Sequence, residues 1–180
     1  FVAKLIDGKV LFTALDKNFG NAAACGYSVS LSPLTTLTEF SNHHQALEEY
    51  LQILGTALDK HPKSSIAKNT ALFTGIFLNA FDLRRSGALR SAQELEKIEL
   101  LINETSLKMI YKLNDAAFRP MFSHLMEWST TGLPKSDLAG KAQRQVSTYG
   151  FLQHLFENLK SIVTSYASYI IDSAVKVLSD

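Results

Sequence analysis

The chain has 180 residues, of which 46% are hydrophobic and 19% are charged; that is enough apolar material for a core and too much for a disordered tail. The 18 basic and 17 acidic residues leave a net charge of +1. They are spread evenly, which excludes a strongly basic nucleic-acid clamp and an acidic tail. The chain begins at Phe1 rather than Met, so we expect it to be a fragment of a longer protein.

The first third of the chain is irregular before it turns helical. Residues 10–15 begin a short apolar face, and the Gly- and Ser-containing stretch over 20–33 predicts a loop or short helical turns. Leucines and a tyrosine then recur at helical spacing, which predicts a helix over 42–60 with Asn42 as its cap. No strand-turn-strand pattern is visible anywhere in the chain.

Two further helices are predicted in the middle of the chain. An apolar stripe over 65–83 indicates a helix that Gly87 would stop. Ser91 with Glu94 three residues later matches a capping box, and the apolar face that follows predicts a helix over 91–112.

Asn114 is a plausible cap for the next predicted helix, over 115–129. Pro120 lies inside this helix, so we expect it to be kinked or to begin late. Residues 130–146 carry glycines, a proline and charged side chains, and we interpret them as an exposed loop between helices. Four residues of the helix are expected to be mostly buried: Phe118, Phe122, Leu125 and Trp128.

The apolar residues after the predicted loop indicate helices over 147–163 and 166–179, with a break near Thr164. The helices therefore form pairs, and the repeat length is slightly above the ~40–47 residues of HEAT and armadillo units. We predict an all-α fold, a HEAT-like α-solenoid of stacked antiparallel helical hairpins spanning 1–180. A closed helical bundle would satisfy the same apolar stripes.

The sequence offers no catalytic, cofactor or metal motif. Gly132 and Gly140 are too far apart for a phosphate-binding loop, and no nucleophile elbow or zinc motif is present. The lone Cys25 is read as a small buried residue, and it fits a reducing compartment. A helical-bundle enzyme would require ionisable groups gathered in one pocket, and His124 with nearby acids is the stretch that could supply them.

Three motifs resemble a known family. Residues 77–84 read Phe-Leu-Asn-Ala-Phe-Asp-Leu-Arg; residues 112–122 read Lys-Leu-Asn-Asp-Ala-Ala-Phe-Arg-Pro-Met-Phe, with Trp128 further on. Residues 149–162 form a third, weaker motif. Together they resemble the C-terminal region of a family of large nucleolar HEAT-repeat proteins, the U-three snoRNA-associated scaffold of the small-subunit processome. Thr164 and the serine after it stand where the family often has Pro.

The resemblance implies a non-catalytic scaffold of the nucleus and nucleolus. It would belong to the early-binding processome subcomplex and support pre-18S rRNA processing and rDNA transcription. Expected partners are the β-propeller proteins of that subcomplex, with the pre-rRNA 5′ external transcribed spacer or a snoRNA as RNA partners.

No membrane, cofactor or small-molecule substrate is expected. A generic α-solenoid adaptor of another pathway is the alternative. Near-zero net charge argues that RNA contacts would be local. The candidate contact residues are Arg84, Arg85, Arg90, Lys112 and Arg119.

Overall fold

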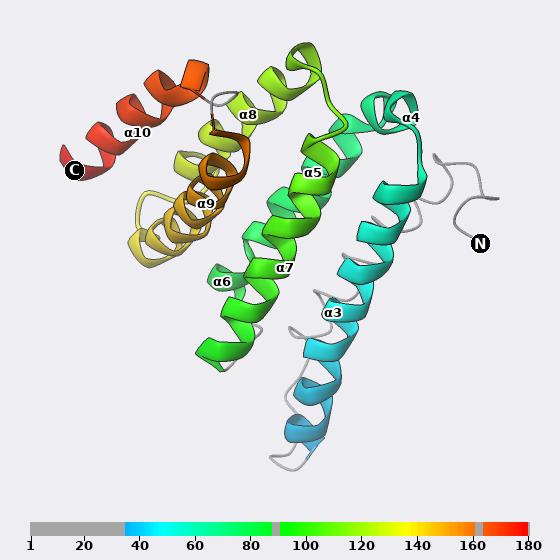
Figure 1. Ribbon diagram of the computed structural model, residues 1–180. Coiled ribbons are helices and arrows are strands. Elements are labelled where there is room, and N and C mark those ends of the chain that lie inside the picture. The colour runs from blue at the N-terminus through cyan, green and yellow to red at the C-terminus, as the bar shows by residue number, and fades with distance from the viewer. Residues whose placement is uncertain (1–34, 88–90, 161–163, 180) are drawn as a thin grey trace.

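The computed structural model describes residues 35–87, 91–160 and 164–179, and every regular element in these ranges is a helix (Figure 1). The all-α prediction is confirmed. The helices are α3 (Thr35–Lys60), α4 (Lys63–Lys68), α5 (Thr70–Phe81), α6 (Leu83–Ser86), α7 (Ala92–Ile110), α8 (Asp115–Thr130), α9 (Leu138–Leu159) and α10 (Ala167–Ser179), with a 3-10 turn at Thr164–Tyr166 before α10. The apolar face predicted over 10–15, the predicted loop over 20–33, Cys25 and Arg90 lie outside the described residues.

Helix α3 packs along α7, and two ion pairs show that the two helices run in the same direction. Lys97 Nζ lies 2.8 Å from Glu48, and Lys108 Nζ lies 2.7 Å from Asp59; each pair joins residues 49 apart in sequence. Helix α5 runs in the opposite sense and packs against α7, behind it in the view of Figure 1. Parallel stacking of equivalent helices is what a series of antiparallel hairpins produces, so the arrangement is compatible with the predicted solenoid.

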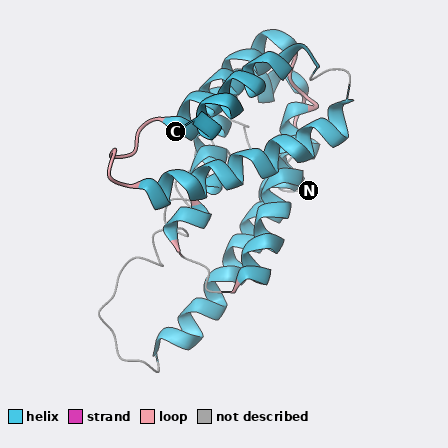
Figure 2. Ribbon diagram, turned by 90° about the vertical axis from the view of Figure 1, so that its left-hand side faces the viewer, coloured by secondary structure: helices cyan, strands magenta, loops and turns pink. Residues whose placement is uncertain are grey.

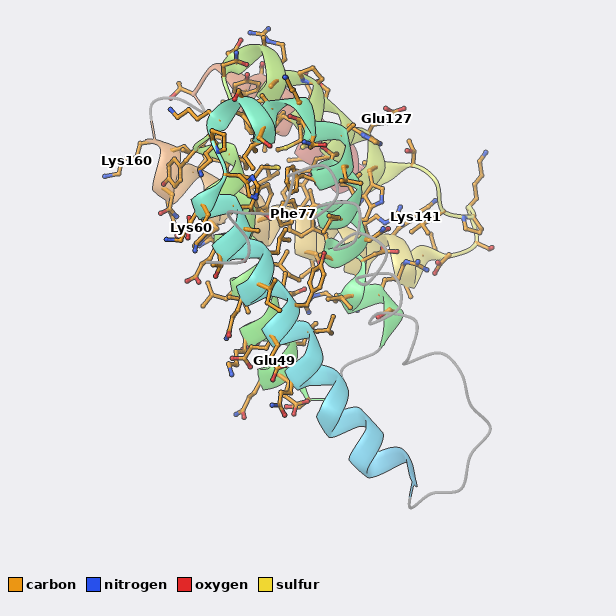
Figure 3. The ribbon with its side chains drawn as sticks, turned by 90° about the vertical axis from the view of Figure 1, so that its right-hand side faces the viewer. Glu49, Lys60, Phe77, Glu127, Lys141 and Lys160 are labelled. Carbon is orange, nitrogen blue, oxygen red and sulfur yellow. The ribbon has the colours of Figure 1, made fainter. Side chains whose placement is uncertain are left out.

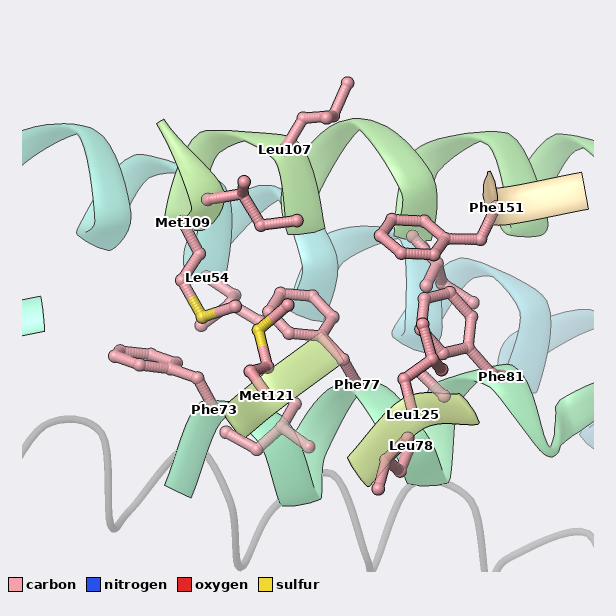
Figure 4. Packing of buried hydrophobic residues seen from close by; sticks show 14 of the residues in the cluster. Leu54, Phe73, Phe77, Leu78, Phe81, Leu107, Met109, Met121, Leu125 and Phe151 are labelled. Carbon is pink, nitrogen blue, oxygen red and sulfur yellow. The ribbon is translucent and has the colours of Figure 1, made fainter. Parts of the chain in front are cut away.

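The core extends from the contact between α3 and α7 to the place where α5, α7, α8 and α9 meet (Figure 4). Phe77 and Phe81 are buried from α5, and the Phe81 ring lies 4.9 Å from the ring of Phe151 on α9. Met109 and Met121 fill the space between α7 and α8. A small apolar cavity of about 20 Å³ is left beside them, which is room for about one water molecule and not for a metabolite.

Local signals place several helix ends as predicted. The side chain of Ser91 accepts a hydrogen bond from the Glu94 amide at the start of α7, and Asn114 Oδ1 accepts one from the Ala117 amide at the start of α8. Gly87 ends α6 in the left-handed conformation, with φ of 65°, which glycine adopts at no steric cost. The break predicted near Thr164 is confirmed by the 3-10 turn there.

Three predictions of helix bounds are wrong. The single helix predicted over 65–83 is divided at Asn69 and Asp82 into α4, α5 and α6. Asn42 lies inside α3, which begins at Thr35, because Leu37 and Phe40 extend the apolar spacing toward the N-terminus. The expected loop over 130–146 is confined to the residues between Thr130 and Leu138, since α9 begins at Leu138.

Gly140 was counted as a loop signal, but it belongs to the first turn of α9. Its amide donates to Asp137 Oδ1 at 2.8 Å, which is the N-cap bond of the helix. A Cβ at this position would collide with the Asp137 carboxylate as it is placed here, so a larger residue would require that side chain to shift. Pro120 also fails to delay its helix, because α8 begins at Asp115 and continues through it.

Candidate functional site

A buried polar junction ties α9 to the end of α5 and to the turn after α8. Its centre is Arg144, whose side chain is 7% exposed. Arg144 Nε and Nη2 donate to the two carboxylate oxygens of Asp82 at 3.0 and 3.3 Å. Its remaining nitrogen, Nη1, donates to the carbonyls of Trp128 and Thr131 at 3.1 and 3.0 Å. All three nitrogens of the guanidinium therefore donate hydrogen bonds within the chain.

Asp82 is shared between two arginines. Arg85 Nε lies 3.0 Å from Oδ1 of this carboxylate, and Arg85 Nη2 lies 2.5 Å from Oδ2. Burial alone would raise the pKa of Asp82, but the hydrogen bonds and charges of Arg85 and Arg144 outweigh it and lower that pKa below its usual 3.8. The carboxylate is thus charged at neutral pH and holds two helices together.

Trp128 packs against the core with only a minor part of its side chain exposed, so the prediction that it is mostly buried is confirmed. One face of its indole is covered by Arg144, whose guanidinium carbon lies 4.1 Å from the ring centroid. This is a cation–π contact inside the chain. The other three residues of the stripe, Phe118, Phe122 and Leu125, are buried as predicted.

A second ion pair joins α6 to α7. Arg84 Nε and Nη2 donate to the two oxygens of Glu99 at 2.9 and 2.5 Å, and the Ser147 hydroxyl donates to the same carboxylate at 2.9 Å. The hydrogen bond to Glu99 raises the pKa of Arg84. Glu99 therefore connects α6, α7 and α9 at one point.

Lys112 closes the C-terminal end of α3. Its ammonium group donates to the carbonyls of Leu58, Asp59 and His61; the bonds to Asp59 and His61 are 3.0 and 2.6 Å long. The last carbonyls of a helix have no partner within it and carry partial negative charge, so an ammonium group from another helix satisfies them.

Arg119 lies at the start of α8 beside the 3-10 turn that precedes α10. Its Nη2 donates to Asp115 at 3.0 Å, and its guanidinium carbon lies 5.9 Å from the centroid of the Tyr166 ring. The Tyr166 hydroxyl donates to Asp115 as well, and this bond lowers the pKa of Asp115. The Tyr166 ring packs against Phe118 and Phe122 at 5.1 and 5.0 Å.

The charged groups of four predicted contact residues therefore bond to other groups of the chain. These residues are Arg84, Arg85, Lys112 and Arg119. That these residues contact a partner stays a prediction. Neither Arg144, the centre of the junction, nor Glu99, the centre of the second ion pair, is among the residues predicted from the sequence. The sequence signal for Arg144 is a cation that shares a helix face with the small residues Ser147 and Thr148. Predicting a loop over 130–146 hides that face.

His124, Asp115 and Glu127 are all exposed, so the pocket that an enzyme would need is not formed by them. Within the described ranges, no three His, Cys, Asp or Glu side chains lie close enough to hold a metal ion. None of the helices described is both long enough and apolar enough to cross a bilayer.

The Lys112 bonds predict a measurable loss of stability. Lys112→Met keeps the aliphatic stem but leaves three carbonyls at the end of α3 without their partner, so we expect a loss of about 2 kcal/mol in the free energy of unfolding. Urea denaturation of the 180-residue chain measures it. Lys108→Met is the control, because its ion pair with Asp59 is about half exposed and is expected to contribute below about 0.5 kcal/mol. Equal losses for the two variants would contradict the capping role.

The fold and the polar junction define a class of protein. It is an all-helical segment in which buried polar side chains connect the helices, and in which the motifs at 77–84 and 112–122 form part of the core. The chain belongs to the BP28CT (NUC211) domain family, whose model matches residues 65–180. Two of the three motifs, at 77–84 and 112–122, contribute directly to the buried core and the ion pairs of this domain.

Among curated proteins, the chain is 82% identical over 179 residues to a Neurospora crassa protein named U3 small nucleolar RNA-associated protein 10. Proteins of the same name from Chaetomium globosum and Pyricularia oryzae are 54% and 44% identical. These alignments cover 98–99% of the chain but only 9–10% of each relative. The resemblance seen in the sequence is therefore confirmed. No solved structure was found to match the chain.

Proposed function

We propose that the chain is a non-catalytic scaffold segment that acts in ribosome biogenesis. The observation that carries the proposal is its 82% identity, across nearly its whole length, to a protein named for association with the U3 small nucleolar RNA. On this proposal the segment works in the nucleus and nucleolus. It belongs to the early-binding subcomplex of the small-subunit processome and supports pre-18S rRNA processing and rDNA transcription.

The physical character of the segment supports a docking role rather than catalysis. The charged side chains buried in the described helices, Asp82, Glu99 and Arg144, bond to one another or to other residues between helices, which is a structural use of charge. Several large apolar side chains, in contrast, are exposed to solvent on the surfaces of α3, α7, α9 and α10. Ile53, Leu100, Leu138, Val146 and Ile171 are each at least half exposed, as expected of a segment that other subunits cover.

The proposed partners are other processome subunits, including the β-propeller proteins of the same subcomplex, with pre-rRNA or snoRNA nearby. The competing proposal is a helical adaptor of another pathway, which would use the same exposed faces but different partners.

One experiment separates the two proposals. The full-length protein is replaced in cells by a version that lacks the segment equivalent to 35–180, and both versions carry the same affinity tag. We expect the deletion to lower the yield of co-purified processome subunits and to lower mature 18S rRNA relative to the large-subunit rRNA. Unchanged 18S levels and unchanged co-purification would overturn the proposal, and recovery of a complex unrelated to ribosome assembly would favour the adaptor.

A further inference from the structure

The corner where α3 passes into α4 carries a group of exposed lysines that form no hydrogen bond or ion pair with another residue in the described part of the chain. This α3–α4 corner consists of Lys60, Lys63 and Lys68, all exposed, together with the exposed hydroxyl of Ser64. Residues 60–81 contain no acidic side chain. The nearest acid in sequence, Asp59, is already paired with Lys108 at 2.7 Å.

The lysines of this corner differ from the arginines of the described helices in their bonding. Arg84, Arg85, Arg119 and Arg144 all bond to carboxylates of the chain. Among the residues that the structure describes, no carboxylate lies within ion-pair distance of Lys60, Lys63 or Lys68. Lys135, Lys141 and Lys160 are also without an ion pair among the described residues, but they belong to other parts of the chain, whereas Lys60, Lys63 and Lys68 fall within nine residues that contain no acid.

The helix dipole accounts for two of these lysines but not for the third. Lys60 and Lys68 stand in the last turns of α3 and α4, where the helix dipole favours a cation. Lys63, in contrast, is the first residue of α4, where the same dipole disfavours positive charge. Ile66, fully buried, fixes α4 to the core and so holds Lys63, Ser64 and Lys68 outward as one surface.

We propose that the α3–α4 corner binds the phosphate backbone of single-stranded RNA. The inference rests on the proposed function, which places the chain in an RNA-containing particle, and it names the surface that contacts that RNA. Three unpaired ammonium groups with a neighbouring hydroxyl are suitable donors to phosphate oxygens. Tyr111, 54% exposed, follows α7 beside Lys112, and Lys112 bonds to the carbonyl of His61 in this corner. An exposed aromatic ring next to a basic surface suits base stacking.

An acidic protein segment is the less favoured occupant. Tight protein docking needs apolar or aromatic side chains that enter pockets on the partner. The outward residues of α4 are Lys63, Ser64, Ala67 and Lys68, which offer charge and hydroxyl groups without a large apolar anchor. Phosphate contacts, in contrast, supply affinity through charge alone.

The first test measures fluorescence anisotropy of a labelled 20-nucleotide uridine RNA with the complete 180-residue chain. Lys60→Gln, Lys63→Gln and Lys68→Gln together are expected to weaken binding about tenfold at 50 mM salt. For three phosphate contacts on a single strand, the wild-type affinity should fall about 20-fold between 50 and 200 mM salt. The triple variant should lose most of this salt dependence.

A second triple variant gives a matched control. Lys135→Gln, Lys141→Gln and Lys160→Gln remove the same charge from positions away from α4, and Lys60 and Lys141 lie on opposite sides of the view in Figure 3. We expect a change in RNA affinity below twofold. Equal losses for the two triple variants would overturn the proposal, because only bulk charge would then matter. Tighter binding of a polyglutamate peptide than of RNA at the α3–α4 corner would overturn the choice of RNA.

The same substitutions in the full-length protein separate this inference from the proposed function. Ultraviolet crosslinking in cells should give less RNA per molecule for the α3–α4 variant, while the co-purified protein subunits stay unchanged. Unchanged crosslinking with intact co-purification overturns the RNA surface and leaves the scaffold proposal standing. If the unchanged full-length protein co-purified no processome subunits, the scaffold proposal would be overturned instead.

Discussion

Replacing Arg144 by Met is expected to lower the free energy of unfolding by about 3 kcal/mol. The substitution keeps the bulk of the side chain but removes the guanidinium that bonds to Asp82 and to the carbonyls of Trp128 and Thr131. Removing one partner of a buried ion pair usually costs about 3–5 kcal/mol. The expected loss lies near the lower end of this range because Arg85 still pairs with Asp82. Urea denaturation of the chain measures the change, with the slope expected to stay constant.

Lys141→Met, three residues earlier on α9, is the control for this variant. Lys141 takes part in no ion pair among the described residues, so its loss should change stability by less than about 0.5 kcal/mol. Combining Arg144→Met with Asp82→Asn should cost less than the sum of the two single changes, because they break the same interaction. Strict additivity would contradict the junction described here.

Phe118→Ala is expected to cost about 3–5 kcal/mol. Phe118 is 5% exposed and packs against Phe122 and Tyr166 at 5.7 and 5.1 Å between ring centroids. The truncation removes a buried ring and leaves a cavity between α8 and the turn that leads into α10. Chemical denaturation gives the size of the loss, and hydrogen exchange should show faster exchange of the α10 amides than in the wild type.

Two further variants serve as controls for Phe118→Ala. Phe118→Leu, which keeps most of the apolar volume, should lose much less, and the exposed Tyr111 changed to Ala should lose under about 0.5 kcal/mol. A Phe118→Ala protein as stable as the wild type would show that this face of α8 is not buried in solution.

The sequence was a good guide wherever the signal is local. The caps at Ser91 and Asn114 and the stop at Gly87 depend on residues within one turn, and each is confirmed. The apolar stripe of α8 depends on helical spacing alone, and three of its four members are buried.

The polar junction depends on partners far apart in sequence, and spacing cannot find them. Arg144 and Asp82 are separated by 62 residues and meet because α9 packs against α6. Arg144 also covers one face of the Trp128 ring, a contact that the spacing of α8 does not reveal. Gly140 was misread for a related reason: glycine is a loop signal in general, but here it leaves room for the carboxylate that caps α9.

The bonds of Arg144 also determine what happens if the backbone is cut. The turn between α8 and α9 is exposed, as Figure 2 shows, and is a natural site for a protease. Arg144 lies beyond this turn and binds carbonyls before it and within it, at Trp128 and Thr131, as well as Asp82 further back. A chain nicked near Ser136 would therefore stay together as two associated fragments, so an intact size on a native column would be no proof of an unbroken polypeptide.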